Sequence, residues 1–248
     1  MAKHVTHCTW EEVPHLPDGV KAELLDGIPP YQRAARSKGY PSLGAGAIYP
    51  LDEDDVVVAD FELADHWPRA YGLDVGWNRT AAAWFARDGD TGVTYLYSEH
   101  YRGQAEPIIH VEAIKARGSW IPGVIDPAAR SRSQKDGSQL LEDYQGMGLD
   151  LAPATNAVSA GILEVWQALS YGHLKVFASC NHWREEFRLY RRDEDGKVVK
   201  EDDHLMDATR YFYLSGRDLM TTRPSDAVEE KLQWPYTRQQ GGTGWMSN

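Results

Sequence analysis

Cysteine, long apolar runs and positive charge are all scarce in this sequence of 248 residues. The only cysteines are Cys8 and Cys180, which excludes a disulfide framework and favours the reducing interior of a cell. No apolar run approaches the roughly eighteen residues of a membrane-spanning helix. The first residues lead into polar sequence instead of the apolar core of a signal peptide. We therefore expect neither secretion nor an association with a membrane.

Positive charge is outweighed, with 26 lysines and arginines against 37 aspartates and glutamates and a net charge of −11. Such a chain has no global attraction for nucleic acid, so a polyanionic partner must be held by local basic patches or by bound cations. What is present is ordinary for a globular protein: 42% of the residues are hydrophobic and 25% are charged. The chain is long enough to bury a core of its own.

The first 69 residues contain seven prolines and several glycines, which interrupt any long periodic run. They predict a connecting segment with one short helix near 18–25. The pattern then changes, because residues 70–75, 81–86 and 94–101 are short apolar or β-rich runs separated by turn residues. Three successive strands joined by tight turns predict an antiparallel meander.

Helices and strands alternate after the meander. The apolar pattern predicts helices near 107–116, 138–145, 161–171, 181–189 and 203–214, and strands near 123–126, 149–152 and 174–177. Asp195-Gly196 lies between the β-compatible flanks 188–192 and 197–200, which predicts an added β-hairpin. The fold class is therefore α/β: a mixed sheet, with the meander continued by parallel strands, flanked by helices. We expect a connecting segment at 1–69, one domain at 70–216 and a flexible tail at 217–248.

Three aspartates stand where such a fold can bring them together: Asp74 in the first strand of the meander, Asp126 at the end of the fourth strand and Asp207 in the last helix. The carboxyl ends of neighbouring parallel strands meet at one edge of a sheet, so Asp74 and Asp126 form a plausible oxygen site for a hard cation such as Mg²⁺ or Mn²⁺. A turn or helix cap is the alternative role for either residue.

The densest ionisable cluster is Glu201-Asp202-Asp203-His204-Leu205-Met206-Asp207. On a helix, Asp203, His204 and Asp207 share one face, which makes Asp203 and His204 further candidate metal ligands. Asp202 or Asp203 also suits the N-cap, where a carboxylate accepts hydrogen bonds from the first turn. Glu186, on the preceding helix, is either an acid that supports this site or part of a solvated helix face.

These motifs together resemble the nuclease domain of the large terminase subunits of tailed bacteriophages. The resemblance is carried by Leu73-Asp74-Val75-Gly76, Val124-Ile125-Asp126-Pro127 and the segment 203–211, in this order, and by the segments 28–36 and 43–50, which are similar to the join between packaging ATPase and nuclease. It implies a ribonuclease H-like fold. It also implies a metal-dependent endonuclease that cuts double-stranded concatemeric viral DNA in the host cytoplasm by two-metal hydrolysis, with Asp74, Asp126 and Asp207 as catalytic metal ligands and His204 as an auxiliary ligand.

The resemblance has one departure: the glycine-rich phosphate-binding loop of the packaging ATPase is missing, since Gly44-Ala45-Gly46 lacks the lysine and the spacing. The chain thus resembles a nuclease half without its motor. Its implied partners are double-stranded DNA, an ATPase domain of the same subunit, the portal protein and the small terminase subunit.

Two basic stretches are candidates for holding DNA phosphates without reading sequence. One follows Asp126, and the other surrounds the predicted hairpin. The candidates are Arg130, Arg132, Lys135, Arg188, Arg191, Arg192, Lys197 and Lys200. Another ribonuclease H-like nuclease, such as a junction resolvase, and a non-catalytic docking module remain as alternatives. The sequence leaves open the source phage, defined-site or headful cutting, the preferred cation, the oligomeric state and the acid that completes the site beside His204.

Without metal, the three carboxylates are expected to repel one another, because like charges within several Å destabilise the ionised site. Asp207→Asn is accordingly expected to raise the melting temperature in EDTA.

Overall fold

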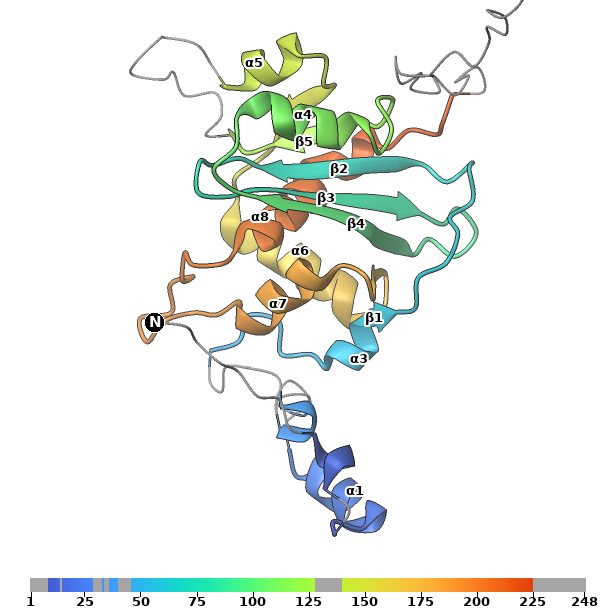
Figure 1. Ribbon diagram of the computed structural model, residues 1–248, viewed down its shortest axis with the longest axis vertical. Helices are drawn as coiled ribbons and strands as arrows, with labels where there is room; N and C mark the ends of the chain where they lie inside the picture. The colour runs from blue at the N-terminus through green and yellow to red at the C-terminus, as the bar shows by residue number, and fades with distance from the viewer. Residues whose placement is uncertain are drawn as a thin grey trace, which may run out of the picture.

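A seven-stranded mixed sheet forms the centre of the molecule, in the order β1-β7-β4-β3-β2-β5-β6 (Figure 1). The computed structural model describes residues 9–13, 15–28, 33, 36–39, 46–127 and 140–224. The strands are β1 (Val57–Val58), β2 (Arg69–Asp74), β3 (Thr80–Arg87), β4 (Thr94–Arg102), β5 (Gly123–Ile125), β6 (Leu151–Pro153) and β7 (Leu174–Phe177).

The strand directions divide the sheet into an antiparallel centre and parallel edges. β2, β3 and β4 pair antiparallel, whereas β5 pairs parallel with β2 and β6 parallel with β5. On the other side, β7 pairs parallel with β4, and β1 parallel with β7. The predicted meander continued by parallel strands is confirmed, and the three meander strands lie within two residues of their predicted bounds.

Helices cover both faces of the sheet (Figure 1). They are α4 (Pro107–Lys115), α5 (Leu140–Gly146), α6 (Val158–Ser170), α7 (Asn181–Leu189) and α8 (His204–Tyr211), and α8 continues into a π-helical turn, η3 (Phe212–Gly216), and a 3₁₀ turn, η4 (Arg217–Leu219). Alternate residues of β3 separate the two cores: Ala83 and Phe85 pack with α6, α7 and α8, whereas Ala82 and Trp84 pack with α4 and α5. This alternation follows from the two-residue period of a strand.

Part of the predicted connecting segment belongs to the packed unit. The segment contains η1 (Trp10–Glu12), α1 (Asp18–Asp26), α3 (Glu53–Val56) and the edge strand β1. Ile48, Tyr49 and Val56 are buried in the same core as α6 and α7. Glu53 is buried as well and makes ion pairs of 2.5 Å with Arg184 and 2.9 Å with Arg188 of α7. The boundary predicted at residue 70 therefore cuts through one continuous core.

The predicted hairpin is only partly formed. Arg188 and Leu189 end α7 instead of extending as a strand, and a single antiparallel bridge joins Arg192 to Val198. Gly196 has a φ of 79°, as a tight turn requires. The turn signal was right, but β pairing across it is minimal because Arg191 pairs with Ala47 of the N-terminal segment.

The tail begins in an ordered pairing. The backbone N–H of Arg69 donates to the carbonyl of Thr221 at 2.8 Å, and that of Thr221 donates back at 3.1 Å. The predicted tail therefore starts beside β2. Its residues 225–248 lie outside the described part of the chain.

Helix α8 lies directly on strand β2 because Gly72 has no side chain. A Cβ at this position would be 2.0 Å from the backbone oxygen of Ala208. That contact is with backbone, which cannot rotate away as a flexible side chain can. The glycine therefore sets how closely α8 approaches the sheet.

We expect Gly72→Ala to destabilise the protein by about 3 kcal/mol, the upper part of the usual range for overpacking, since α8 must shift to admit the methyl group. Gly89→Ala is the matched control, because a Cβ at Gly89 meets nothing within 4 Å. Urea unfolding of both variants and the wild type measures the difference. Equal midpoints for the two variants would contradict close packing of α8 on β2.

Candidate functional site

Alternation along β2 directs Asp74 to the face of the sheet that α8 covers. Ala70 and Gly72 face the α8 side, whereas Tyr71 and Leu73 enter the opposite core with α4 and α5. Asp74 is two residues beyond Gly72, so it takes the same side as Gly72. It stands at the end of the strand and is partly buried, and its carboxylate contacts His204 in the first turn of α8.

Strand β5 brings Asp126 to the same edge. Leu73 and Ile125 are register partners in the parallel pair, and the backbone N–H of Asp126 donates to the carbonyl of Leu73 at 3.0 Å. Ile125 packs in the core with α4 and α5, and Val124 packs against Tyr211 on the other face. Asp126 therefore follows β5 where Asp74 ends β2, as the carboxyl ends of neighbouring parallel strands predict.

Asp207 adds a third carboxylate from α8. Burial is the main cause that raises the pKa of Asp74, and the negative charges of Asp207 and then Asp126 raise it further. The same three carboxylates add to the effect of burial in raising the pKa of Tyr211. These mutual effects place the three predicted aspartates in one electrostatic neighbourhood.

His204 compensates the charge of Asp74. Its Nδ1 lies 3.0 Å from Oδ2 of Asp74, and this hydrogen bond opposes the effect of burial on the pKa of the aspartate. The same bond is the main cause that raises the pKa of His204. The structure thus brings His204 together with Asp74, while Asp207, three residues further along α8, is bound by other groups.

Asp207 is held by two cationic side chains. Lys200 Nζ lies 2.8 Å from its Oδ2, and Arg210 Nη2 lies 3.0 Å from its Oδ1. Lys200 also contacts Oδ2 of Asp203 at 2.9 Å, so its ammonium group bridges two carboxylates. Arg210 is 1% exposed and donates from Nη1 to Oδ1 of Asn156 at 3.1 Å. A buried arginine needs such a partner, because an unpaired buried charge is costly.

The expectation that the carboxylates simply repel one another is corrected by these pairs. Lys200, which the sequence suggested as a DNA contact, and Arg210 both neutralise Asp207. Among the residues that the structure describes, no three histidine, cysteine, aspartate or glutamate side chains form a group that could hold a metal ion. The donor chemistry is that of a hard-cation site, but the side chains are oriented toward the protein's own cations.

The N-cap of α8 is supplied differently from the prediction. Asp203 is the N-cap residue, but its side chain makes no capping hydrogen bond. Glu186 of α7 takes this role: its Oε2 accepts from the backbone N–H of Leu205 at 2.6 Å and of Met206 at 3.2 Å. Burial raises the pKa of Glu186 to about 7. Glu186 therefore supports the helix that carries His204 and Asp207, the first of the two roles considered for it.

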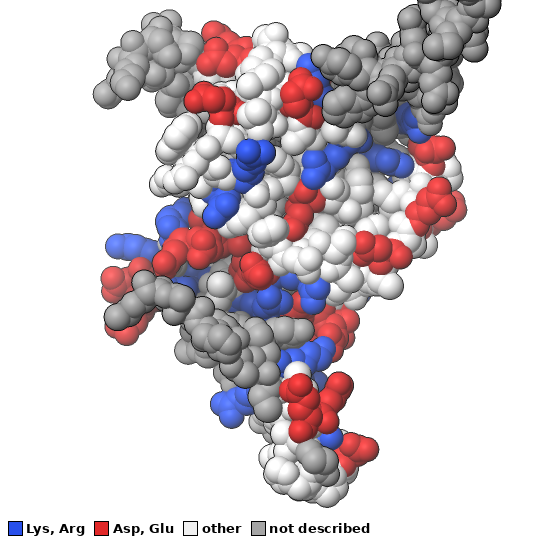
Figure 2. Space-filling model, viewed as in Figure 1, with Lys and Arg blue, Asp and Glu red and all other residues white. Residues whose placement is uncertain are grey.

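The predicted DNA-binding residues are spread over different environments. Arg130, Arg132 and Lys135 lie outside the described residues. Arg188 pairs with the buried Glu53 and Lys200 with Asp203 and Asp207. Arg191 lies 3.6 Å from Glu201, and Arg192 donates to the carbonyl of Gly196 at 2.8 Å. Figure 2 shows acidic and basic side chains intermixed beside the segment that joins α7 to α8.

Sequence reasoning missed the cations that bind Asp207 and the anchoring role of Glu53. A signal existed for Arg210, which follows Asp207 at the i+3 spacing of a helical ion pair. Lys200 precedes Asp203 by three residues, but it lies outside the helix, so its pairing with Asp203 and Asp207 was not predicted. No local signal exists for Glu53, because its partners Arg184 and Arg188 lie 131 and 135 residues away in the sequence. None of the described helices is both long and apolar enough to span a membrane.

A mixed sheet with this strand order and flanking helices defines a ribonuclease H-like fold, and comparisons with known proteins agree. Residues 71–215 match the family model of the terminase RNaseH-like domain. The large terminase subunit of Salmonella phage P22 is 32% identical over 240 residues, which are 93% of this chain and 48% of that protein. The chain belongs to the terminase RNaseH-like domain family.

Solved structures show the same fold. The nuclease domain of the P22 large terminase aligns with a TM-score of 0.66 and 32% identity, over 72% of this chain and 96% of that one. The large terminase of a thermophilic bacteriophage, in complex with ADP, aligns with a TM-score of 0.60 and 23% identity, over 84% and 54% of the two chains. The chain spans about half the length of the curated relatives that it matches.

We expect Asp207→Asn to lower the melting temperature in EDTA, because the amide leaves the buried Arg210 without a negative partner. The loss should be about 2 kcal/mol, or about 5 °C for a protein of this size. Glu201→Gln is the control, since its exposed pair with Arg191 spans 3.6 Å and such surface pairs contribute little. A higher melting temperature for Asp207→Asn would instead show that repulsion among the carboxylates outweighs the ion pair between Asp207 and Arg210.

Proposed function

We propose that this chain is a divalent-metal-dependent endonuclease that cleaves double-stranded, concatemeric viral DNA during genome packaging. The observation that carries the proposal is the convergence of Asp74, Asp126 and Asp207 at one end of the sheet. Carboxylates that share one site offer several oxygen ligands to a divalent cation. Membership of the terminase family and the likeness to the P22 large terminase nuclease domain support the same reaction class.

Mg²⁺ or Mn²⁺ suits the oxygen donors of this site. Bound between the carboxylates, two such cations would activate water for attack on a phosphodiester and stabilise the leaving oxygen. Asp74, Asp126 and Asp207 are the proposed ligands, with His204 or Asp203 as an auxiliary ligand. Glu186 positions His204 and Asp207 by fixing the start of α8.

Lys200 and Arg210 contact the oxygens of Asp207, so at least one of them must move before a metal ion can bind there. Lys200 occupies Oδ2 of both Asp203 and Asp207, and it is half exposed, so it can swing into solvent. Arg210 is buried and occupies Oδ1 of Asp207. We therefore propose that Asp207 offers Oδ2 to the metal while Arg210 continues to hold Oδ1 and fix the rotamer of the carboxylate.

The DNA strand next to the site requires positive groups of its own. Arg191, Arg192 and Lys197 lie on the turn before α8 and remain the proposed phosphate contacts, together with the basic residues of 130–135 outside the described part. The relatives are about twice as long as this chain, so we propose an ATPase domain of the same subunit as its partner. The portal protein, the small terminase subunit and the host cytoplasm complete the proposed context.

Plasmid cleavage tests the activity. The wild type should cut double-stranded DNA with Mn²⁺ or Mg²⁺ and not with EDTA. Asp126→Asn should cut at least about 100-fold more slowly, because a lost ligand removes several kcal/mol of transition-state stabilisation. Asp90→Asn, on the exposed turn between β3 and β4, is the matched control and should cut normally.

The same assay separates the alternatives. Cutting in EDTA, or full activity of Asp126→Asn, would refute the proposed site. A strong preference for four-way junctions over linear duplex would favour a junction resolvase. An inactive protein whose melting temperature does not respond to Mn²⁺ would favour a docking module.

Lys200→Ala should bind Mn²⁺ about tenfold more tightly than the wild type, because the metal no longer displaces an ammonium group from Asp203 and Asp207. Calorimetric titration without DNA measures the affinity directly. Lys197→Ala is the control, as Lys197 lies on the same turn and makes no side-chain contact with either aspartate. Equal affinities of the wild type and Lys200→Ala would show that Lys200 does not occupy the metal site.

A further inference from the structure

A polar cavity lies at the opposite end of the sheet from the aspartates. Its volume is about 410 Å³, within the range of small-ligand pockets. Arg87 ends β3 and Thr94 begins β4, and both line this cavity. Asp74 pairs with Ala81 near the other end of β3, so the two sites are separated by about 20 Å along the strand. The cavity is therefore not part of the proposed nuclease site.

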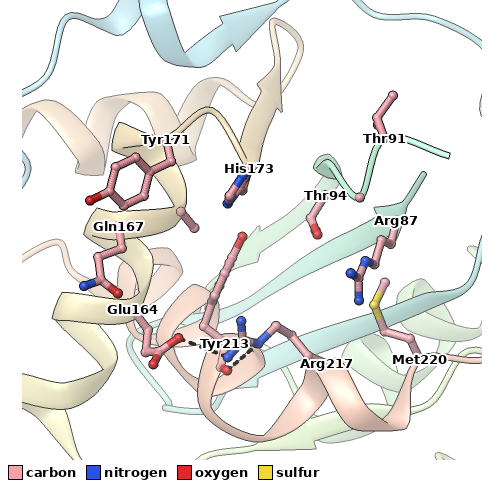
Figure 3. Close-up of a pocket in the computed structure, with 12 residues that line it drawn as sticks. Arg87, Thr91, Thr94, Glu164, Gln167, Tyr171, His173, Tyr213, Arg217 and Met220 are labelled. Atoms are coloured by element: carbon pink, nitrogen blue, oxygen red, sulfur yellow. Dashed lines mark hydrogen bonds and ion pairs between the residues drawn. The ribbon is translucent and has the colours of Figure 1, made fainter. Parts of the chain in front are cut away.

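The floor of the cavity contains a buried hydroxyl whose hydrogen bonding is incomplete. Tyr213 is 3% exposed, and Figure 3 shows its Oη directed into the cavity, between His173 and Thr94. A close contact with the Thr94 hydroxyl acts to lower the pKa of Tyr213, but the contact does not meet hydrogen-bond geometry, and no other described residue supplies a partner for Oη. Burial outweighs this effect and raises the pKa of Tyr213, so the hydroxyl is a donor at neutral pH. Buried donors without a well-placed partner are rare in folded proteins, and one that points into a cavity indicates a missing acceptor.

Positive charge is concentrated on one side of this hydroxyl. The Arg87 guanidinium makes no ion pair or hydrogen bond with the described residues, and its charge acts on Tyr213. Arg217 is already compensated, because its Nη2 lies 3.0 Å from Oε2 of Glu164 and its Nε donates to the carbonyl of Tyr213. In Figure 3, Arg87 and the Thr94 hydroxyl lie across the cavity from Glu164. An anion is therefore favoured on the Arg87 side.

The other side of the cavity has different chemistry. Tyr171 is 71% exposed, and its ring centroid lies 6.2 Å from that of His173. Gln167, in the last turn of α6, also lines this side of the cavity, near Tyr171 (Figure 3). An exposed ring offers a stacking surface, and an amide offers one donor and one acceptor to the edge of a heterocycle.

We infer that this cavity binds a nucleotide unit, with its phosphate between Arg87 and the Tyr213 hydroxyl and its base on Tyr171 beside Gln167. An arginine and the hydroxyls of Tyr213 and Thr94 suit the oxygens of a phosphate. Aromatic stacking with an amide at the base edge suits a nucleobase. The unit can come from a free nucleotide or from single-stranded DNA, which share this chemistry. The inference is independent of the proposed nuclease activity.

Titration calorimetry in EDTA with dAMP, adenosine and inorganic phosphate tests the site. dAMP should bind at least about tenfold more tightly than adenosine or phosphate alone, because one molecule then carries both the base and the phosphate that the cavity contacts. Arg87→Gln should reduce dAMP affinity to that of adenosine, and Tyr171→Ala should reduce it to that of phosphate. Both side chains are exposed, so the fold should persist. Tyr213→Phe removes only the hydroxyl and should weaken dAMP and phosphate but not adenosine.

Arg102→Gln is the control, since Arg102 is an exposed arginine at the far end of β4, and it should bind dAMP as the wild type does. Displacement of dAMP by a short oligothymidylate would identify single-stranded DNA as the source of the unit, and no displacement would identify a free nucleotide. Absence of dAMP binding to the wild type would overturn the inference. So would affinities that Arg87→Gln and Tyr171→Ala leave unchanged.

Discussion

The direct contact between α8 and β2 is the constraint on which the carboxylate site depends. Gly72 allows the backbone of Ala208 to approach a distance that any side chain would prevent. Asp74 lies two residues after this glycine, and Asp207 lies one residue before Ala208. A single contact therefore fixes the separation of two aspartates that are far apart in the sequence, and β5 adds Asp126 by its register with β2.

Charge compensation within the chain makes this convergence possible. His204 pairs with Asp74, and Lys200 and Arg210 pair with Asp207, so the folded protein does not require a bound cation to tolerate the three carboxylates. The compensating groups differ in burial. Arg210 is inaccessible and acts as a fixed structural partner, whereas Lys200 is half exposed and can be exchanged for another cation. One oxygen of Asp207, Oδ1, is thus held by the buried Arg210, whereas Oδ2 is held by a lysine that can move away.

The antiparallel order of β2, β3 and β4 could be predicted from the sequence, because residue alternation along a strand is a local signal. The proximity of Asp74, Asp126 and Asp207 could also be predicted, because strand ends are marked locally in the sequence. It could not reveal β1, since two valines after a short helix carry no strand pattern, and their pairing with β7 is purely tertiary. The hairpin was overestimated for the same reason: Asp195-Gly196 specifies a turn, while the pairing of Arg191 with Ala47 is non-local. Lys200 was assigned to DNA although Asp203 is only three residues away, whereas the partners of Glu53, 131 and 135 residues away, were inaccessible to any local argument.

Net charge is a poor guide to where this protein can bind an anion. The excess of acidic residues, −11 overall, predicts weak attraction for polyanions at long range. At short range the balance differs from place to place: Glu164 neutralises Arg217, but Arg87 on the same cavity has no carboxylate partner among the described residues. Binding then depends on which cations remain uncompensated after folding. Ion pairing inside the structure, and not composition, determines that distribution.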